Sequence, residues 1–113
     1  MHELGIVYEV IKVVDNFVKE NNIQKVEKIV LEIGQLSQAI PRFIEECYPA
    51  AVDGTLYENT KLEIQAIPAN VKCRDCNEIF NIIEYHKICP KCSSQQYDEI
   101  SGHEFNIKEV IAY

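Results

Sequence analysis

The sequence predicts a small α+β or α/β fold in which two helices pack on a three-stranded mixed sheet, with an inserted four-cysteine module. Three observations support this prediction: an amphipathic repeat in the first twenty residues, β-branched runs further along the chain, and two closely spaced cysteine pairs. A chain of 113 residues, 47% hydrophobic and 26% charged, has the composition of one globular domain with room for a small metal-held module.

The first predicted helix covers Glu3–Glu20. Apolar residues recur in it at steps of three and four, with charged residues between them, and this spacing places one apolar stripe along a helix. Asn21 and Asn22 follow, and asparagine tolerates the left-handed conformation that commonly ends a helix. The apolar positions are Leu4, Val7, Val10, Ile11, Val14, Phe17 and Val18.

Two strands and a second helix are predicted next. Residues 26–33 are rich in valine and isoleucine and precede a glycine, which is typical of a strand. Pro41 suits the first turn of a helix that ends near Gly54, and Pro49 inside it predicts a kink or an early break. Lys61–Ile67 alternates apolar and polar residues, so it predicts a second strand, parallel to the first because a helix connects them.

The chain after Gly102 predicts a last strand that rejoins the first sheet. Alternation returns at Phe105 and Ile107 and, after a slip of one residue, continues to the end of the chain. We therefore expect an α/β domain made of residues 1–68 plus 100–113, and a metal-held domain of residues 69–99 inserted into it.

Four of the five cysteines form two C-x2-C pairs, Cys73 with Cys76 and Cys89 with Cys92. Zn²⁺ favours four ligands in a tetrahedron, and each C-x2-C turn supplies two thiolates. The pattern predicts a zinc-ribbon-like module with a closed, structural zinc site, because four thiolates leave no position for a reactive water. We expect the spacer, residues 77–88, to form a hairpin that brings the two pairs together.

Charge and motif content argue against other roles. The formal net charge of −7 and the balanced charges of residues 71–98 disfavour nucleic-acid binding. Two cysteine pairs, rather than one at the start of a helix, disfavour a thioredoxin-like redox dithiol. Cys47 is spaced like a core residue of the second helix, and no catalytic triad or phosphate-binding loop is present, so we expect no enzyme.

Membrane and export signals are also missing from the sequence. Its longest stretch without a charged residue is far shorter than a membrane helix requires, and its start lacks a basic segment followed by an apolar run. We expect a cytoplasmic protein with no membrane partner.

The amino terminus offers a second set of metal ligands. The α-amine of Met1 and the amide and imidazole nitrogens of His2 can meet one ion in fused chelate rings, and these donors suit Ni²⁺ or Cu²⁺ better than Zn²⁺. Glu3 can offset the positive end of the helix dipole and add a ligand. The alternative that these residues leave open is a frayed helix start in which Glu3 only favours the dipole.

Several short segments, taken together over nearly the whole chain, carry a family resemblance. They are Met1-His2-Glu3-Leu4, Glu32-Ile33-Gly34-Gln35-Leu36-Ser37, Asp53-Gly54-Thr55, the two C-x2-C pairs and Ser101-Gly102-His103-Glu104-Phe105. In this combination and order the sequence resembles the HypA/HybF family of hydrogenase nickel-incorporation proteins.

The resemblance implies a nickel metallochaperone rather than an enzyme. It places Ni²⁺ on His2, with Glu3 assisting, and a structural Zn²⁺ on the four paired cysteines. It also implies cooperation with a partner GTPase of the HypB type and delivery of nickel, directly or indirectly, to the large subunit of NiFe hydrogenase, and in some bacteria to urease. The alternative function is a zinc-ribbon interaction adaptor with no role in metal transfer.

Two further histidines are weaker candidates. His86 lies three residues before Cys89 and can replace a lost zinc ligand, and His103 can relay metal between the two domains. For both, the sequence favours a plain surface position.

Overall fold

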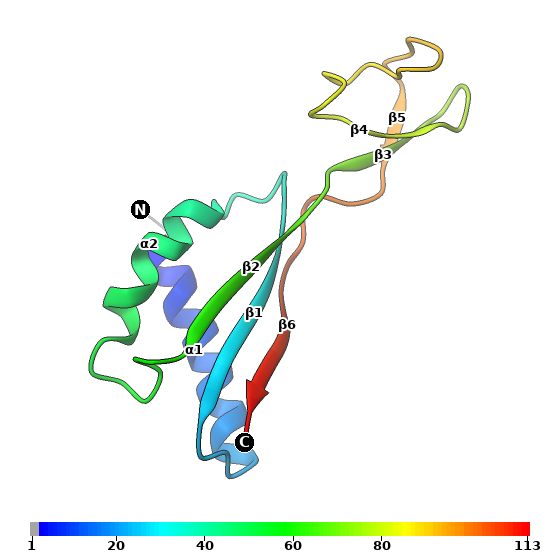
Figure 1. Ribbon diagram of the computed structural model, residues 1–113. Coiled ribbons are helices and arrows are strands. Elements are labelled where there is room, and N and C mark those ends of the chain that lie inside the picture. Colours follow the sequence, from blue (N-terminus) through cyan, green and yellow to red (C-terminus); the bar gives the residue numbers. More distant parts are fainter. Residues whose placement is uncertain (1–2) are drawn as a thin grey trace.

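A three-stranded sheet covered by two helices forms the larger lobe of the protein (Figure 1). The computed structural model describes residues 3–113, and Met1 and His2 lie outside the described residues. The helices are α1 (Glu3–Glu20) and α2 (Pro41–Val52), and the strands follow the order β2 (Lys61–Ile67), β1 (Val26–Gly34), β6 (Phe105–Ala112). None of the helices in the described part of the chain combines the length and apolar character needed to cross a membrane.

The strand directions confirm the predicted mixed sheet. β1 runs parallel to β2, with Ile29 opposite Leu62, and antiparallel to β6, with Ile33 opposite Phe105. The helix α2 connects the two parallel strands, and the last strand of the chain returns to the first sheet as expected.

The slip in the apolar pattern of the last strand is a β-bulge. Val30 pairs with Glu109 but Leu31 pairs with Ile107, so Lys108 is an extra residue in β6. The bulge restores the inward direction of the residues that follow it. Phe105, Ile107, Val110 and Ala112 consequently all pack against the core beneath the helices.

The core of the larger lobe lies between the sheet and the helices. Ile29, Leu31 and Ile33 of β1 are at most 1% exposed and pack with the valine stripe of α1. The other face of the sheet carries polar side chains: Lys28 Nζ lies 2.9 Å from Glu63 Oε1, although Val30 on this face is also buried. This difference explains why the two helices pack on one face only.

The second helix corrects one expectation. α2 continues through Pro49 to Val52, so the predicted early break near Tyr48 is wrong. Buried side chains lie on both sides of the proline, Ile44 and Tyr48 before it and Ala51 and Val52 after it, and their packing outweighs the hydrogen bond that proline removes. The predicted end is correct, because Asp53 caps the helix and Gly54 follows with a φ of 72°.

The smaller lobe contains a second three-stranded sheet. Its strands β3 (Asn70–Cys73), β4 (Ile79–Asn81) and β5 (Tyr97–Glu99) follow the order β4-β3-β5, and both pairings are antiparallel. In chain order this sheet lies between β2 and β6, and in space it extends from one end of the larger lobe (Figure 1). Its small core combines Ala69, Val71, Phe80 and Ile82 with Cys73 and Cys89.

The predicted hairpin within residues 77–88 is wrong. Only β4 forms there, and it pairs with β3 across the first cysteine turn. After β4 the chain turns because Asn81 Oδ1 accepts hydrogen bonds from the N–H groups of Ile83 and Glu84, each at 3.0 Å. The second cysteine pair therefore reaches the first through a series of turns rather than along a strand.

A short, tightly packed junction joins the two lobes. Leu36 N–H donates to Gly102 C=O at 2.7 Å, and Gln35 Oε1 accepts from Ala69 N–H at 2.8 Å and from Asn81 Nδ2 at 2.9 Å. A Cβ atom added to Gly34 would lie 2.1 Å from Gly102 O, so only glycine fits at this position. The junction thus holds the end of β1 against both of the segments that connect the two lobes, one at Ala69 and one at Gly102.

Candidate metal centre

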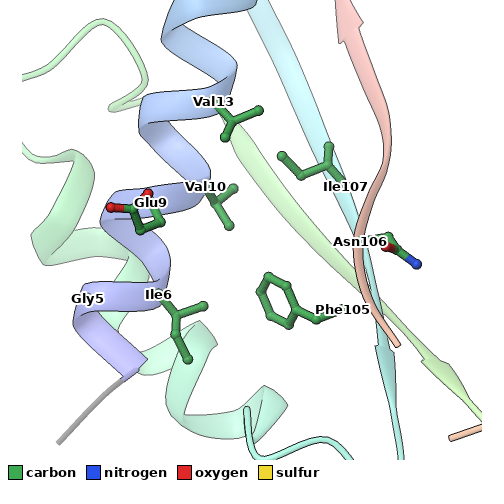
Figure 2. A pocket seen from close by; sticks show the side chains of 8 residues that line it. All are labelled: Gly5, Ile6, Glu9, Val10, Val13, Phe105, Asn106 and Ile107. Carbon is green, nitrogen blue, oxygen red and sulfur yellow. The ribbon is translucent and has the colours of Figure 1, made fainter. Parts of the chain in front are cut away.

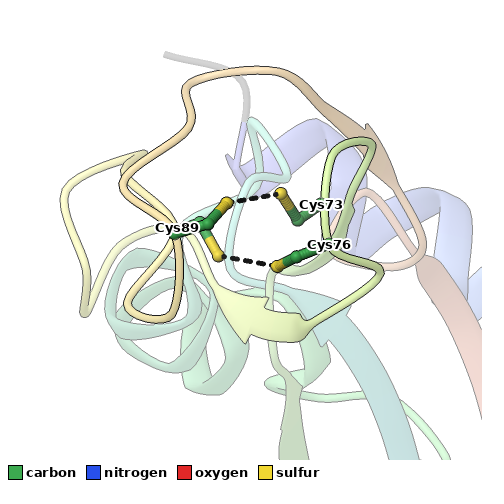
Figure 3. Close-up of side chains that lie close together, drawn as sticks. Cys73, Cys76 and Cys89 are labelled. Atoms are coloured by element: carbon green, nitrogen blue, oxygen red, sulfur yellow. Dashed lines mark hydrogen bonds between the residues drawn. The ribbon is translucent and has the colours of Figure 1, made fainter.

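The four paired cysteines converge in the smaller lobe. Figure 3 labels three of them, Cys73, Cys76 and Cys89. Their sulfur atoms all lie within 4.8 Å of one another, and Cys73–Cys92 and Cys76–Cys89 are each separated by 3.5 Å. Four thiolates bound to one Zn²⁺ at about 2.3 Å in a tetrahedron are separated by about 3.8 Å. The spacing of the sulfur atoms therefore fits one four-coordinate zinc ion.

Two similar backbone turns present these sulfur atoms. In the first, Asn77 N–H donates to Cys73 C=O at 3.0 Å, and in the second, Ser93 N–H donates to Cys89 C=O at 2.9 Å. Asn77 and Ser93 adopt the left-handed region, with φ of 66° and 61°. Each turn points both of its thiols to the same side, which is the arrangement that a shared ion requires.

Outside the sulfur cluster, polar side chains connect the first turn to the second turn and to β5. Asp75, inside the first C-x2-C pair, accepts a short hydrogen bond from Ser94 Oγ, which follows the second pair. Arg74 forms an ion pair with Asp98 of β5 at 2.7 Å. We did not predict these contacts, because each joins residues about twenty positions apart and neither residue type carries a distinctive spacing.

The metal-free thiols differ in acidity. Burial opposes ionisation of Cys73, but the N–H groups of Cys76 and Asp75 and the Cys92 thiol lower its pKa to about 7. The N–H of Ser94 favours ionisation of Cys92, but burial and the neighbouring thiols raise the pKa of Cys92 to about 12. At neutral pH the cluster is therefore partly protonated, so binding of a metal ion there would release protons and would weaken as the pH falls.

The other predicted metal ligands are not part of this cluster. Within residues 3–113, the four cysteines are the one group of three or more His, Cys, Asp or Glu side chains close enough to hold an ion. His86 is exposed, and exposed His103 lies 2.6 Å from Glu99 instead. Glu3 occupies the first turn of α1, and the two proposed nickel ligands before it lie outside the described residues.

Cys47 has no part in a metal cluster among the described residues. It is half-buried and packs against the core of the larger lobe from α2. Its expected core position is thus only partly reached, since one side of the thiol remains accessible.

Comparison with known proteins gives matches over nearly the full chain. The sequence model of one family, described as hydrogenase/urease nickel incorporation, metallochaperone, hypA, matches residues 1–112. A hydrogenase maturation factor HypA of Moorella thermoacetica is 34% identical over 107 residues, covering 95% of each chain. A hydrogenase maturation factor HypA of Trichodesmium erythraeum is 37% identical over 110 residues, covering 97% of this chain and 94% of the relative.

A solved structure shares the fold. The solution structure of the Ni metallochaperone HypA from Helicobacter pylori superposes with a TM-score of 0.66 at 23% identity, covering 99% of this chain and 97% of the other. Both lobes are therefore included in the similarity. With a family match over the full length and relatives above 30% identity, the chain belongs to the HypA family, a family of metallochaperones and maturation factors rather than enzymes.

Proposed function

We propose that this protein carries Ni²⁺ on its amino terminus and delivers it to a nickel-containing hydrogenase during maturation. The observation that supports this most strongly is the match to the nickel-incorporation family over residues 1–112, which includes Met1, His2 and Glu3. The relatives above 30% identity are named hydrogenase maturation factors.

The proposed nickel ligands are the Met1 α-amine and the His2 imidazole, with Glu3 assisting. Nitrogen donors suit Ni²⁺, which ranks above most divalent metals in affinity for such ligands. The carboxylate of Glu3 lies in the first turn of α1, where it lowers the electrostatic cost of a cation at the positive end of the helix dipole. The α-amine must lose its proton to bind, so nickel affinity decreases as the pH falls.

The four-cysteine cluster is a second candidate metal site, and we assign it a different role from the amino terminus. We propose that the cysteine cluster holds Zn²⁺ as a structural ion, because four thiolates close its coordination sphere. Nickel at the amino terminus has fewer protein ligands and keeps positions open for an incoming ligand. A cargo ion needs such positions, because transfer proceeds by exchange of one ligand at a time.

Delivery of nickel to an enzyme requires partner proteins. We propose that a GTPase of the HypB type supplies the nucleotide hydrolysis for which this chain has no phosphate-binding loop. The recipient is the large subunit of the hydrogenase, reached directly or through that GTPase in the cytoplasm. The family description also names urease, and we propose urease as a second recipient.

Calorimetric titration of Ni²⁺ into untagged, zinc-loaded protein tests the proposal. We expect one nickel site, which His2→Ala removes and which an amino-terminal extension weakens because it converts the α-amine into an amide. The matched control is His86→Ala, which removes an exposed histidine of the smaller lobe and leaves nickel binding unchanged. Equal nickel binding by the wild type and the His2→Ala variant would reduce the chain to a zinc-ribbon adaptor.

A further inference from the structure

An open apolar groove of about 760 Å³ lies between α1 and β6 (Figure 2). Ile6, Val10 and Val13 line it from the helix, and Phe105 and Ile107 line it from the strand. Figure 2 shows Phe105 and Ile107 pointing towards α1, whereas Asn106 points away from it. Among the described residues, Glu9 is the only charged residue of the lining.

The groove exists because the sheet ends before it covers the flank of α1. Val13 is 53% exposed and Phe17, one turn further along, is 42% exposed, although Val10 and Val14 on the adjacent core side are buried. A strand placed beyond β6 would cover this flank. Exposed apolar side chains that form a continuous stripe commonly mark a surface that a partner covers.

The edge of β6 offers backbone groups for such a strand. The sheet order places β1 on one side of β6 and, among the described residues, no strand on the other. Gly34 N–H donates to Glu104 C=O, and hydrogen bonds alternate along an antiparallel pair, so the N–H and C=O of Phe105 and Ile107 point to the free edge. The same two residues line the groove with their side chains.

Gly5 keeps one end of the groove open. A Cβ atom added there would meet no atom of residues 3–113 within 4 Å, so packing within this part of the chain does not require glycine at that position. Alanine is the better helix former by up to about 1 kcal/mol. A glycine at this position leaves space for a bound segment that approaches the first turns of α1.

We propose that this groove binds an extended segment of a partner protein, which adds to β6 as a fourth strand. Alternate apolar side chains of the segment enter the groove, and a basic side chain pairs with Glu9. The net charge of −7 favours a basic partner over a second copy of this chain, which would carry the same charge. The bulge at Lys108 limits the pairing to the short stretch of β6 before it.

The position of the groove suggests what its partner does. Its lining begins at Gly5, two residues after Glu3, so in the sequence the groove follows closely on the proposed nickel ligands. Assigning the partner a part in nickel transfer rests on the proposed function, whereas the docking surface itself does not.

Synthetic peptides with alternating valine and threonine, flanked by lysines or by glutamates, test the docking surface. With isotope-labelled, zinc-loaded protein we expect saturable amide shifts at Phe105 and Ile107, and binding about fivefold weaker for the glutamate-flanked peptide. Val13→Lys should weaken binding of the lysine-flanked peptide at least about tenfold, because it places a charge in the apolar flank. The matched control, Tyr8→Lys, changes a 51% exposed side chain of the same helix outside the groove and should bind like the wild type.

Three results would overturn the proposal: no saturable shifts, shifts elsewhere, or equal effects of Val13→Lys and Tyr8→Lys. A dimer seen by light scattering and abolished by Val13→Lys, without peptide binding, would assign the groove to a second copy instead. The Val13→Lys variant should keep the nickel stoichiometry and zinc content of the wild type. Failure of the docking surface is thereby distinguished from failure of the nickel site, which His2→Ala reports.

Discussion

The buried Tyr57 links two parts of the larger lobe through its hydroxyl group. Tyr57 is 3% exposed, and its hydroxyl donates to Asp15 Oδ1 of α1 at 2.7 Å. Lys19, and then the Tyr57 hydroxyl, lower the pKa of Asp15, and burial raises the pKa of Tyr57 far above its usual range. The ring belongs to the segment after α2, so this contact fixes that segment against α1.

Removing this hydroxyl tests its contribution. We expect Tyr57→Phe to lower the free energy of unfolding by about 1 kcal/mol at pH 7, measured with urea. Because the pKa of Asp15 is lower in the folded state, its stabilising effect is present above about pH 4 and is lost as the pH falls further. The difference between variant and wild type should therefore shrink in acid, and Tyr8→Phe, at a half-exposed position, should be neutral at both pH values. A pH-independent difference would contradict this reading of the pair.

Gly34 is the residue on which the junction between the lobes depends most. We expect Gly34→Ala to destabilise the protein by about 3 kcal/mol, because the new Cβ would meet backbone atoms of Gly102 that cannot move aside cheaply. Gly5→Ala, whose Cβ meets nothing within 4 Å, is the matched control and should be neutral or slightly stabilising in the same urea experiment. Equal stabilities of the two variants would show that the junction adapts.

At the scale of elements, the sequence predicted those whose apolar pattern is local. The bounds of α1 and β2 and the bulge in β6 are visible as periodicity or as its interruption. The predicted break at Pro49 is wrong because the hydrogen bond that proline removes is a local effect, whereas the burial of Ala51 and Val52 that compensates for it depends on tertiary packing. The predicted hairpin after Cys76 is wrong because the side chain of Asn81 starts a turn within an apolar run whose pattern is typical of a strand.

The candidate sites were predictable to different degrees. The spacing alone predicted that the four cysteines lie together, because two C-x2-C pairs supply the four thiolates that one tetrahedral ion takes. The groove beside β6 was not predictable, because it depends on where the sheet ends. The periodicity likewise assigned Phe17, one turn beyond the groove residue Val13, to the core stripe, whereas Phe17 is exposed. Which strand lies at an edge depends on sheet order, which the sequence pattern does not reveal.

Chelation of zinc tests the proposed division of the chain into residues 1–68 plus 100–113 and residues 69–99. The smaller lobe buries few apolar side chains, and two of its six buried core residues are the proposed zinc ligands Cys73 and Cys89. We therefore expect metal removal to unfold residues 69–99 and to leave the larger lobe folded, as judged by amide chemical shifts in the two ranges. Loss of amide chemical-shift dispersion in both ranges, or in neither of them, would contradict the division.

The whole molecule is elongated, with extents of 54 × 28 × 16 Å, and its two cores are separate. The cysteine cluster lies in the smaller lobe, whereas the amino-terminal helix belongs to the larger one (Figure 1). Under the proposed function, this separation would allow one metal to support the fold while another is exchanged, because the proposed ligands of the two ions do not overlap. The central claim is therefore that nickel and zinc occupy different sites.

Nickel X-ray absorption spectroscopy of the zinc-loaded protein with one equivalent of Ni²⁺ tests that claim most directly. The account predicts a nickel shell of nitrogen and oxygen ligands that includes imidazole, which the His2→Ala variant loses while its zinc stays bound to four sulfur atoms. Sulfur ligands on nickel, or displacement of zinc in proportion to the nickel added, would place both metals on the cysteines and contradict it.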